Sequence, residues 1–146
     1  SSRWHNSLSE CLDSLCKLEI AEKSVPVLDA IVILQRELNM DQNIRVRYLE
    51  KLLLISPLNE NLFYLAEFYA SMKQYKKSFD VLSQIILLPC FKKDKNAWKL
   101  LLEVLQNINQ KDLELNYWLW NCWTKEAKKN LTEEEQSILQ NVVDSV

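Results

Sequence analysis

The chain has 146 residues, of which 48% are hydrophobic and 26% charged, with a net charge of −2 and no glycine. This length is enough for one domain with its own hydrophobic core, and the near-neutral charge excludes a strong overall attraction to nucleic acid or to an anionic membrane. Phosphate-binding loops, dinucleotide-binding fingerprints and nucleophile elbows need glycine, so the composition excludes them. It also disfavours the tight hairpins of an all-β fold.

Apolar residues recur at helical spacing along nearly the whole chain, and the alternation typical of strands is absent. We therefore predict an all-α protein of about eight helices joined by short loops. The expected helices cover approximately residues 7–22, 26–39, 41–55, 57–72, 75–88, 95–108, 112–130 and 132–145. Two pairs with capping-box spacing, Ser7 with Glu10 and Thr132 with Glu135, mark the first and the last helix.

Prolines and aspartates mark the other helix boundaries. Pro26 suits the first turn of the second helix, Pro57 should end the third helix and start the fourth, and Pro89 should close the fifth. Asp41 and Asp112 are expected to cap the third and the seventh helix.

The apolar pattern also repeats along the chain. We take as a template the positions Leu62, Leu65, Ala66, Tyr69, Tyr75, Ser78, Leu82 and Ile85. A shift of 34 residues toward the N-terminus brings it onto eight positions, five of them apolar or aromatic: Leu28, Ile31, Val32, Gln35, Asp41, Ile44, Tyr48 and Lys51. A shift of 36 residues the other way brings its first four positions onto Trp98, Leu101, Leu102 and Leu105. This period indicates stacked antiparallel helical hairpins, each covering the apolar face of its neighbour.

The middle repeat carries the residue pattern of a known family. A large residue, Leu62, is followed by the aliphatic Leu65 and the small Ala66, and the pattern continues through Tyr69, Tyr75, Ser78, Leu82, Ile85 and a slightly early Pro89. These residues resemble a tetratricopeptide repeat, in which the small residue lets paired helices approach. The alternative is a generic helical bundle in which the 34-residue echo is a coincidence.

The resemblance covers about 100 residues and is weaker outside the middle repeat. The next match opens with the preferred Trp98 but has Leu102 in place of the small residue, and Lys73 stands where glycine commonly makes the turn. It implies one right-handed α-solenoid domain, residues 1–146, with a leading helix, three repeats and a capping helix at 7–22, 26–57, 58–91, 95–130 and 132–145. The leading helix has no partner, and the chain opens with serine, so we expect a processed product or a piece of a longer protein.

No pattern in the chain supports catalysis or metal binding. The four cysteines, Cys11, Cys16, Cys90 and Cys122, are not spaced as CxxC, and the only histidine, His5, lies near the N-terminus. We expect a non-enzymatic protein without cofactor or metal. We also expect buried, reduced thiols and an intracellular location, cytoplasmic or nuclear.

Two surface features suggest binding. Lysines cluster in three places: Lys73, Lys76 and Lys77; Lys92, Lys93, Lys95 and Lys99; and Lys125, Lys128 and Lys129. They form either a solvated rim or a basic patch for an acidic peptide or an RNA backbone. Four aromatic residues, Tyr117, Trp118, Trp120 and Trp123, crowd into seven positions of one helix. Either Trp120 and Trp123 pack under the last helix or, as we predict, at least one stays partly exposed and is buried by a partner or a second copy.

The family resemblance implies a concave groove that holds a peptide or an amphipathic helix. The first helices of the three repeats would line it with Gln35, Phe63, Tyr64, Glu67, Lys99 and Glu103. Phe63, Tyr64 and Glu67 stand where relatives that grip chaperone tails carry basic residues or asparagine, which disfavours that activity. We expect a non-catalytic adaptor or scaffold subunit of a multiprotein complex. The alternative is a helical-repeat RNA-binding protein that uses the lysine-rich loops.

Overall fold

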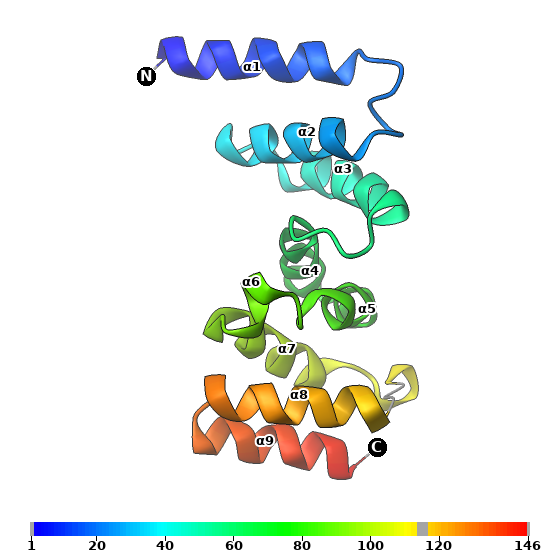
Figure 1. Ribbon diagram of the computed structural model, residues 1–146, viewed down its shortest axis with the longest axis vertical. Helices are drawn as coiled ribbons and strands as arrows, with labels where there is room; N and C mark the ends of the chain where they lie inside the picture. The colour runs from blue at the N-terminus through cyan, green and yellow to red at the C-terminus, as the bar shows by residue number, and fades with distance from the viewer. Residues whose placement is uncertain (1, 114–116, 146) are drawn as a thin grey trace. The chain divides into compact units, whose positions relative to one another are not determined.

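The computed structural model describes the backbone of residues 2–113 and 117–145, and all their side chains except those of residues 2, 110 and 117–119 (Figure 1). Within these residues the chain forms nine α-helices and one 3-10 helix and contains no strand, which confirms the all-α prediction. The helices are α1 Ser2–Cys16, α2 Val25–Glu37, α3 Gln42–Ile55, α4 Leu62–Ser71, α5 Tyr75–Ile85, α6 Pro89–Lys92, α7 Lys95–Asn107, α8 Tyr117–Asn130 and α9 Glu133–Asp144. The 3-10 helix is Gln110–Asp112.

The chain divides into two compact units, Ser1–Leu65 and Ala66–Val146. The first unit contains α1, α2, α3 and the start of α4. The second contains the rest of α4 and helices α5 to α9. The organisation of the chain as one domain stays a prediction.

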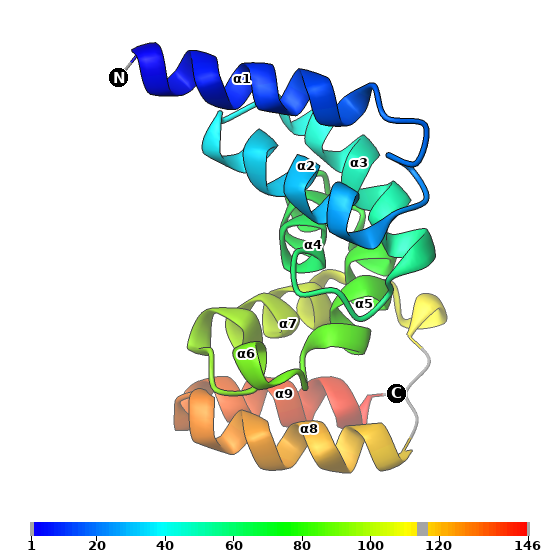
Figure 2. The same ribbon diagram turned by 45° about the horizontal axis from the view of Figure 1, so that its top comes forward.

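In the first unit α2 packs against both α1 and α3 (Figure 2). Leu12, Leu28, Ile31 and Leu52 are among the buried side chains of the three helices. Asp29 also ties α2 to the segment before α4, because its Oδ1 accepts hydrogen bonds from the side-chain amides of Asn59 (2.7 Å) and Asn61 (3.0 Å).

In the second unit α7 is the central helix, in contact with α5, α6, α8 and α9. Its apolar residues are buried around much of its circumference: Ala97, Trp98, Leu101, Leu102, Val104 and Leu105. A helix that is apolar on several faces needs neighbours on several sides, and α7 has them. Helices α8 and α9 also pack against each other (Figure 2).

The capping predictions have mixed outcomes. The Thr132 hydroxyl accepts from the Glu135 amide at 3.1 Å, and the Glu135 carboxylate accepts from the Thr132 amide at 3.0 Å, which confirms the second capping box. The first is wrong: Ser7 lies inside α1, where its hydroxyl donates to the carbonyl of Arg3 at 3.1 Å. Helix α1 accordingly begins at Ser2 and ends at Cys16, earlier at both ends than residues 7–22.

The other boundary signals also divide. Pro26 lies in the first turn of α2, and Asp41 caps α3, as predicted. Pro57 does not start a helix, because turns continue to the beginning of α4 at Leu62. Pro89 opens the short helix α6, since its fixed φ fits a first turn. Asp112 ends the 3-10 helix, and residues 114–116, which separate it from α8, lie outside the described residues.

One turn occurs twice, 34 residues apart. Asn39 after α2 and Lys73 after α4 have φ values of 51° and 59°, the left-handed region that favours glycine. The amide of the following residue bonds to a carbonyl five residues back in both turns: Met40 to Gln35 at 3.0 Å and Gln74 to Tyr69 at 2.8 Å. Both helices therefore end in a Schellman-type turn, although neither turn contains glycine.

Burial follows the predicted repeat in first helices only. All twelve side chains at the equivalent positions of α2, α4 and α7 are buried: Leu28, Ile31, Val32, Gln35; Leu62, Leu65, Ala66, Tyr69; Trp98, Leu101, Leu102, Leu105. The second-helix echo is wrong at one matched pair, because Ile44 is 39% exposed whereas Ser78 is fully buried. Leu49 and Leu52 are the buried residues of α3.

Candidate functional site

The residues predicted to line a concave groove fall in both units. Gln35, Phe63 and Tyr64 belong to the first unit, and Glu67, Lys99 and Glu103 belong to the second. They therefore do not form one described site. Gln35 is moreover only 1% exposed, so its assignment to a partner-contacting surface is wrong. Its position on the buried side of α2, with Leu28 and Ile31, is the physical reason.

Tyr64 already has partners inside the first unit. Arg36 Nη1 donates to its hydroxyl at 2.8 Å, and the guanidinium carbons of Arg36 and Arg45 lie 5.3 and 5.7 Å from the ring centroid. Burial opposes the charge of Arg36, but its hydrogen bonds to Tyr64 and Glu37 raise its pKa above the ordinary value. These contacts join the end of α2 to the start of α4. Phe63 beside it is half-buried.

Glu67, Lys99 and Glu103 are exposed. Lys99 lies close enough to α9 to act on Glu135. Hydrogen bonds from Thr132 lower the pKa of Glu135, and the charge of Lys99 lowers it further. Lys99 thus stabilises the start of α9 electrostatically.

The predicted exposed tryptophan patch is wrong. Trp120 is 8% exposed and Trp123 is fully buried. Their rings meet edge to face at 6.2 Å, and Trp123 meets Phe79 in the same way at 5.9 Å. Helix α8 has α7 and α9 as neighbours, so more than one of its faces is covered. The side chains of Tyr117 and Trp118 lie outside the described residues.

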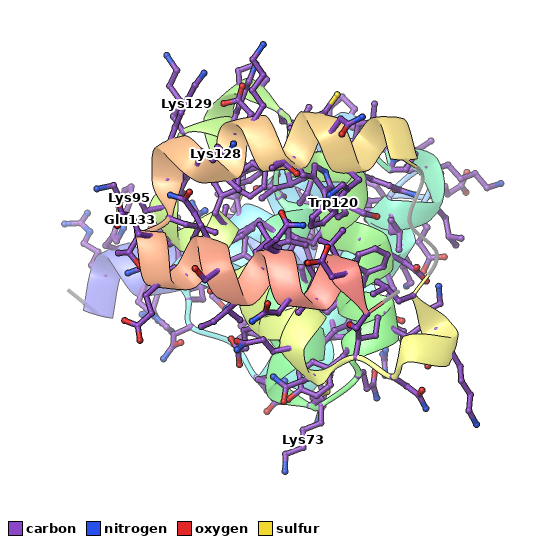
Figure 3. The ribbon with its side chains drawn as sticks, turned by 90° about the horizontal axis from the view of Figure 1, so that it is seen from below. Lys73, Lys95, Trp120, Lys128, Lys129 and Glu133 are labelled. Carbon is purple, nitrogen blue, oxygen red and sulfur yellow. The ribbon has the colours of Figure 1, made fainter. Side chains whose placement is uncertain are left out.

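A groove of about 230 Å³ lies between α8 and α9, and we call it the terminal groove. Figure 3 shows Trp120 between these two helices. The groove is lined by Trp120, Thr124, Ala127, Lys128, Glu133, Gln136, Ser137, Leu139 and Gln140. Trp120, Ala127 and Leu139 are buried and form its apolar floor, whereas the other lining residues are more exposed.

The neutral polar side chains of the terminal groove are already hydrogen-bonded within the chain. Thr124 donates to the Trp120 carbonyl at 2.9 Å, Gln136 to the Leu131 carbonyl at 2.9 Å, Ser137 to the Glu133 carbonyl at 3.1 Å, and Gln140 to the Asp144 carboxylate at 2.9 Å. An incoming group therefore meets an apolar floor with few uncommitted neutral polar groups. Such a groove suits an apolar side chain.

The fold brings two of the three lysine clusters together. We call the seven residues Lys92, Lys93, Lys95, Lys99, Lys125, Lys128 and Lys129 the lysine face. The carbonyl of Lys92 joins its two parts, because it accepts hydrogen bonds from Trp98 Nε1 and Asn130 Nδ2, both at 3.0 Å. In Figure 3, Lys95, Lys128 and Lys129 lie at the same end of α8 and α9, and Lys73 lies on a different side.

The sequence analysis missed Glu126 as part of this surface. Glu126 is 7% exposed, and its carboxylate lies 3.4 Å from Lys92 Nζ and 3.7 Å from Lys129 Nζ. It therefore neutralises part of the lysine face. The signal was its helical spacing from Trp123 and Asn130, which places all three on neighbouring turns of one side of α8.

The cysteines and His5 show no sign of a reactive or metal-binding arrangement. Cys11 and Cys90 are exposed and Cys16 and Cys122 are half-buried, so the expectation of buried thiols is wrong. The surface of α1 around Cys11 and the short helix α6 around Cys90 are not covered by other elements. In the part of the chain that the structure describes, no three His, Cys, Asp or Glu side chains are grouped to hold a metal ion.

Comparison with protein-family models, curated proteins and solved structures finds no match for this chain. Of the helices within the described ranges, none has the length and apolar character needed to cross a membrane.

Proposed function

We propose that this chain is a non-catalytic protein-binding module, an adaptor or scaffold subunit, and that the terminal groove is its binding site. The observation that carries the proposal is the groove itself. Its floor of Trp120, Ala127 and Leu139 is apolar, and its neutral polar rim is satisfied internally. At about 230 Å³ it is smaller than a pocket for a whole small-molecule ligand and close to the size of one large side chain.

We further propose a tetratricopeptide-like arrangement of helical hairpins. The repeated left-handed turn at Asn39 and Lys73 supports it, because the period of 34 residues is that of this family. The shared burial pattern of α2, α4 and α7 also supports it. In such an array the terminal hairpin has only one neighbour, so its outer groove is free to take a partner segment.

Filling the groove tests the proposal. Ser137 lines the groove and is exposed, and its hydroxyl bonds to the carbonyl four residues back. Ser14 on α1 is the matched control, because it is also exposed and bonds to the carbonyl four residues back. Peptides are selected from a random phage-displayed library on the immobilised full chain, and soluble variants then compete for them.

Soluble Ser14→Phe should compete as well as the unmodified chain, and Ser137→Phe should fail to compete. Circular dichroism of both variants checks that the helices are intact. Equal competition by Ser137→Phe would show that the selected peptides bind elsewhere. A selection that enriches no peptide would also contradict the proposal.

RNA binding by the lysine-rich loops is the second candidate, favoured by the joining of two lysine clusters through Lys92 and Asn130. Stacking of bases on aromatic side chains usually accompanies such binding, and Trp98, Trp120 and Trp123 are buried. Titration with a single-stranded oligouridylate at increasing salt tests this candidate, because binding through phosphates weakens steeply with salt.

A further inference from the structure

We infer that the partner of the terminal groove is a protein segment with an apolar side chain flanked by carboxylates, and that the carboxylates lie on the lysine face. This inference rests on the proposed function and names the chemistry of the partner. The steps that follow concern uncommitted charge, continuity with the groove, and the choice between protein and RNA.

Four cations of the lysine face lack an anionic neighbour. Among the described residues, Lys93, Lys95, Lys125 and Lys128 form no ion pair, whereas Lys92 and Lys129 share Glu126. Solvated lysines at one end of a helical unit attract carboxylates, and the attraction grows as water is excluded by a bound segment.

Most carboxylates near these lysines have another role. Asp94 accepts from the Asn96 amide at 2.9 Å as the cap of α7, and Glu135 is part of the capping box of α9. Glu126 is occupied by two lysines. Glu133 and Glu134 are exposed at the start of α9 and would repel an acidic segment. The attraction is therefore strongest along α8 and the segment from Lys92 to Lys95, away from α9.

The lysine face continues into the terminal groove. Lys128 is a member of both, since it is one of the groove-lining residues and lies one turn after Thr124 on α8. In Figure 3 the end of α8 that carries Lys128 and Lys129 lies beyond the position of Trp120 along the same helix. A segment whose apolar side chain enters the groove over Trp120 can thus place its flanking residues beside Lys128.

The chemistry of this surface favours carboxylates of a protein over the phosphates of RNA. All eleven basic residues from Ala66 to the C-terminus are lysines, and the four arginines lie in the first unit. Arginine is the residue that binds phosphate in a bidentate manner and stacks on bases. Three of the four tryptophans whose side chains are described, Trp98, Trp120 and Trp123, are buried in the second unit, so they offer no stacking surface.

The test uses four fluorescent probes and the full chain. The first is a short peptide with one phenylalanine between aspartates, the second replaces the aspartates with lysines, the third replaces the phenylalanine with serine, and the fourth is oligouridylate. Fluorescence anisotropy measures binding. We expect the first peptide to bind at least about tenfold more tightly than the second and the third, and more weakly at high salt.

Two double variants of equal charge change locate the contact. Lys95→Glu with Lys128→Glu should weaken binding of the first peptide about tenfold. Lys73→Glu with Lys111→Glu, which lie outside the lysine face, should leave it unchanged. Circular dichroism confirms that each double variant retains its helices.

The remaining outcomes separate this inference from the proposed function. If the lysine-containing peptide binds as tightly as the aspartate-containing one, and Ser137→Phe abolishes both, the groove binds a partner but the acidic chemistry is wrong. If only oligouridylate binds, and the Lys95 and Lys128 variant loses it, the lysine face is an RNA site and the inference is overturned. If no probe binds, the inference is also wrong, and the phage selection still decides the proposed function.

Discussion

The hydroxyl of Ser78 donates a hydrogen bond of 2.8 Å to the carbonyl oxygen of Ala66, and both residues are fully buried. The bond joins α4 to α5 across the turn that contains Lys73. Both side chains are small, so the two helix backbones can come close enough for a serine hydroxyl to reach a carbonyl on the neighbouring helix. The pairing is the structural counterpart of the small residues seen at these two positions of the repeat pattern.

Replacing Ala66 with leucine should destabilise the protein by roughly 1–3 kcal/mol, because three additional carbons must fit at a position with no free space. Urea denaturation followed by circular dichroism measures the loss. Ala30→Leu on α2 is the control, since Ala30 is only half-buried and should change stability much less. An unchanged unfolding midpoint for Ala66→Leu would show that the site tolerates a large side chain.

Leu52 and Leu54 of α3 provide a matched pair two residues apart. Leu52 is fully buried, whereas Leu54 is 84% exposed. Leu52→Ala should cost about 2–5 kcal/mol of folding free energy through lost burial and the cavity it leaves. Leu54→Ala should stay within about 0.5 kcal/mol of the unmodified chain. Thermal unfolding of the two variants checks the register of α3, and equal losses would contradict it.

Lys73→Gly should stabilise the protein by about 0.5–1 kcal/mol. Lys73 has a φ of 59°, a conformation that is strained for residues with a Cβ atom and free of that strain for glycine. Lys77→Gly is the control, because this residue lies within α5, where glycine should cost about 1 kcal/mol. Chemical denaturation should therefore move the two midpoints in opposite directions.

The contribution of Glu135 to stability should depend on pH. Hydrogen bonds from Thr132 lower the pKa of Glu135 below its ordinary value, so the folded state favours the carboxylate form. The resulting stabilisation is present above the ordinary glutamate pKa of about 4.3 and is lost as the pH falls through the lowered folded value.

Glu135→Gln should therefore destabilise the chain at neutral pH and become nearly neutral in acid. Glu134→Gln tests for a general charge effect, because Glu134 is exposed at the start of the same helix and is not part of the capping box. Unfolding midpoints measured across the acidic range give the comparison. A Glu135→Gln effect that does not diminish in acid would exclude this role.

Local features of the helices were predictable from the sequence where a single interaction between neighbouring residues decides them. Asp41 and Thr132 cap helices because their side-chain oxygens reach amides two or three residues later. The turn at Lys73 was also predictable, since the repeat pattern places a turn there. Ser7 shows the limit of such local signals. A serine hydroxyl can either cap a helix or bond to a carbonyl inside one, and at Ser7 it does the second.

The binding surface depended on the tertiary structure. The crowding of aromatic residues near Trp120 was visible in the sequence, but the number of faces of α8 that are covered depends on α7 and α9, and both pack against it. The lysine face likewise required Lys92 and Asn130, which are 38 residues apart, to meet through one hydrogen bond. Helical periodicity determines which residues share a face of one helix. Only the packing of elements distant in sequence decides whether that face becomes core, groove or surface.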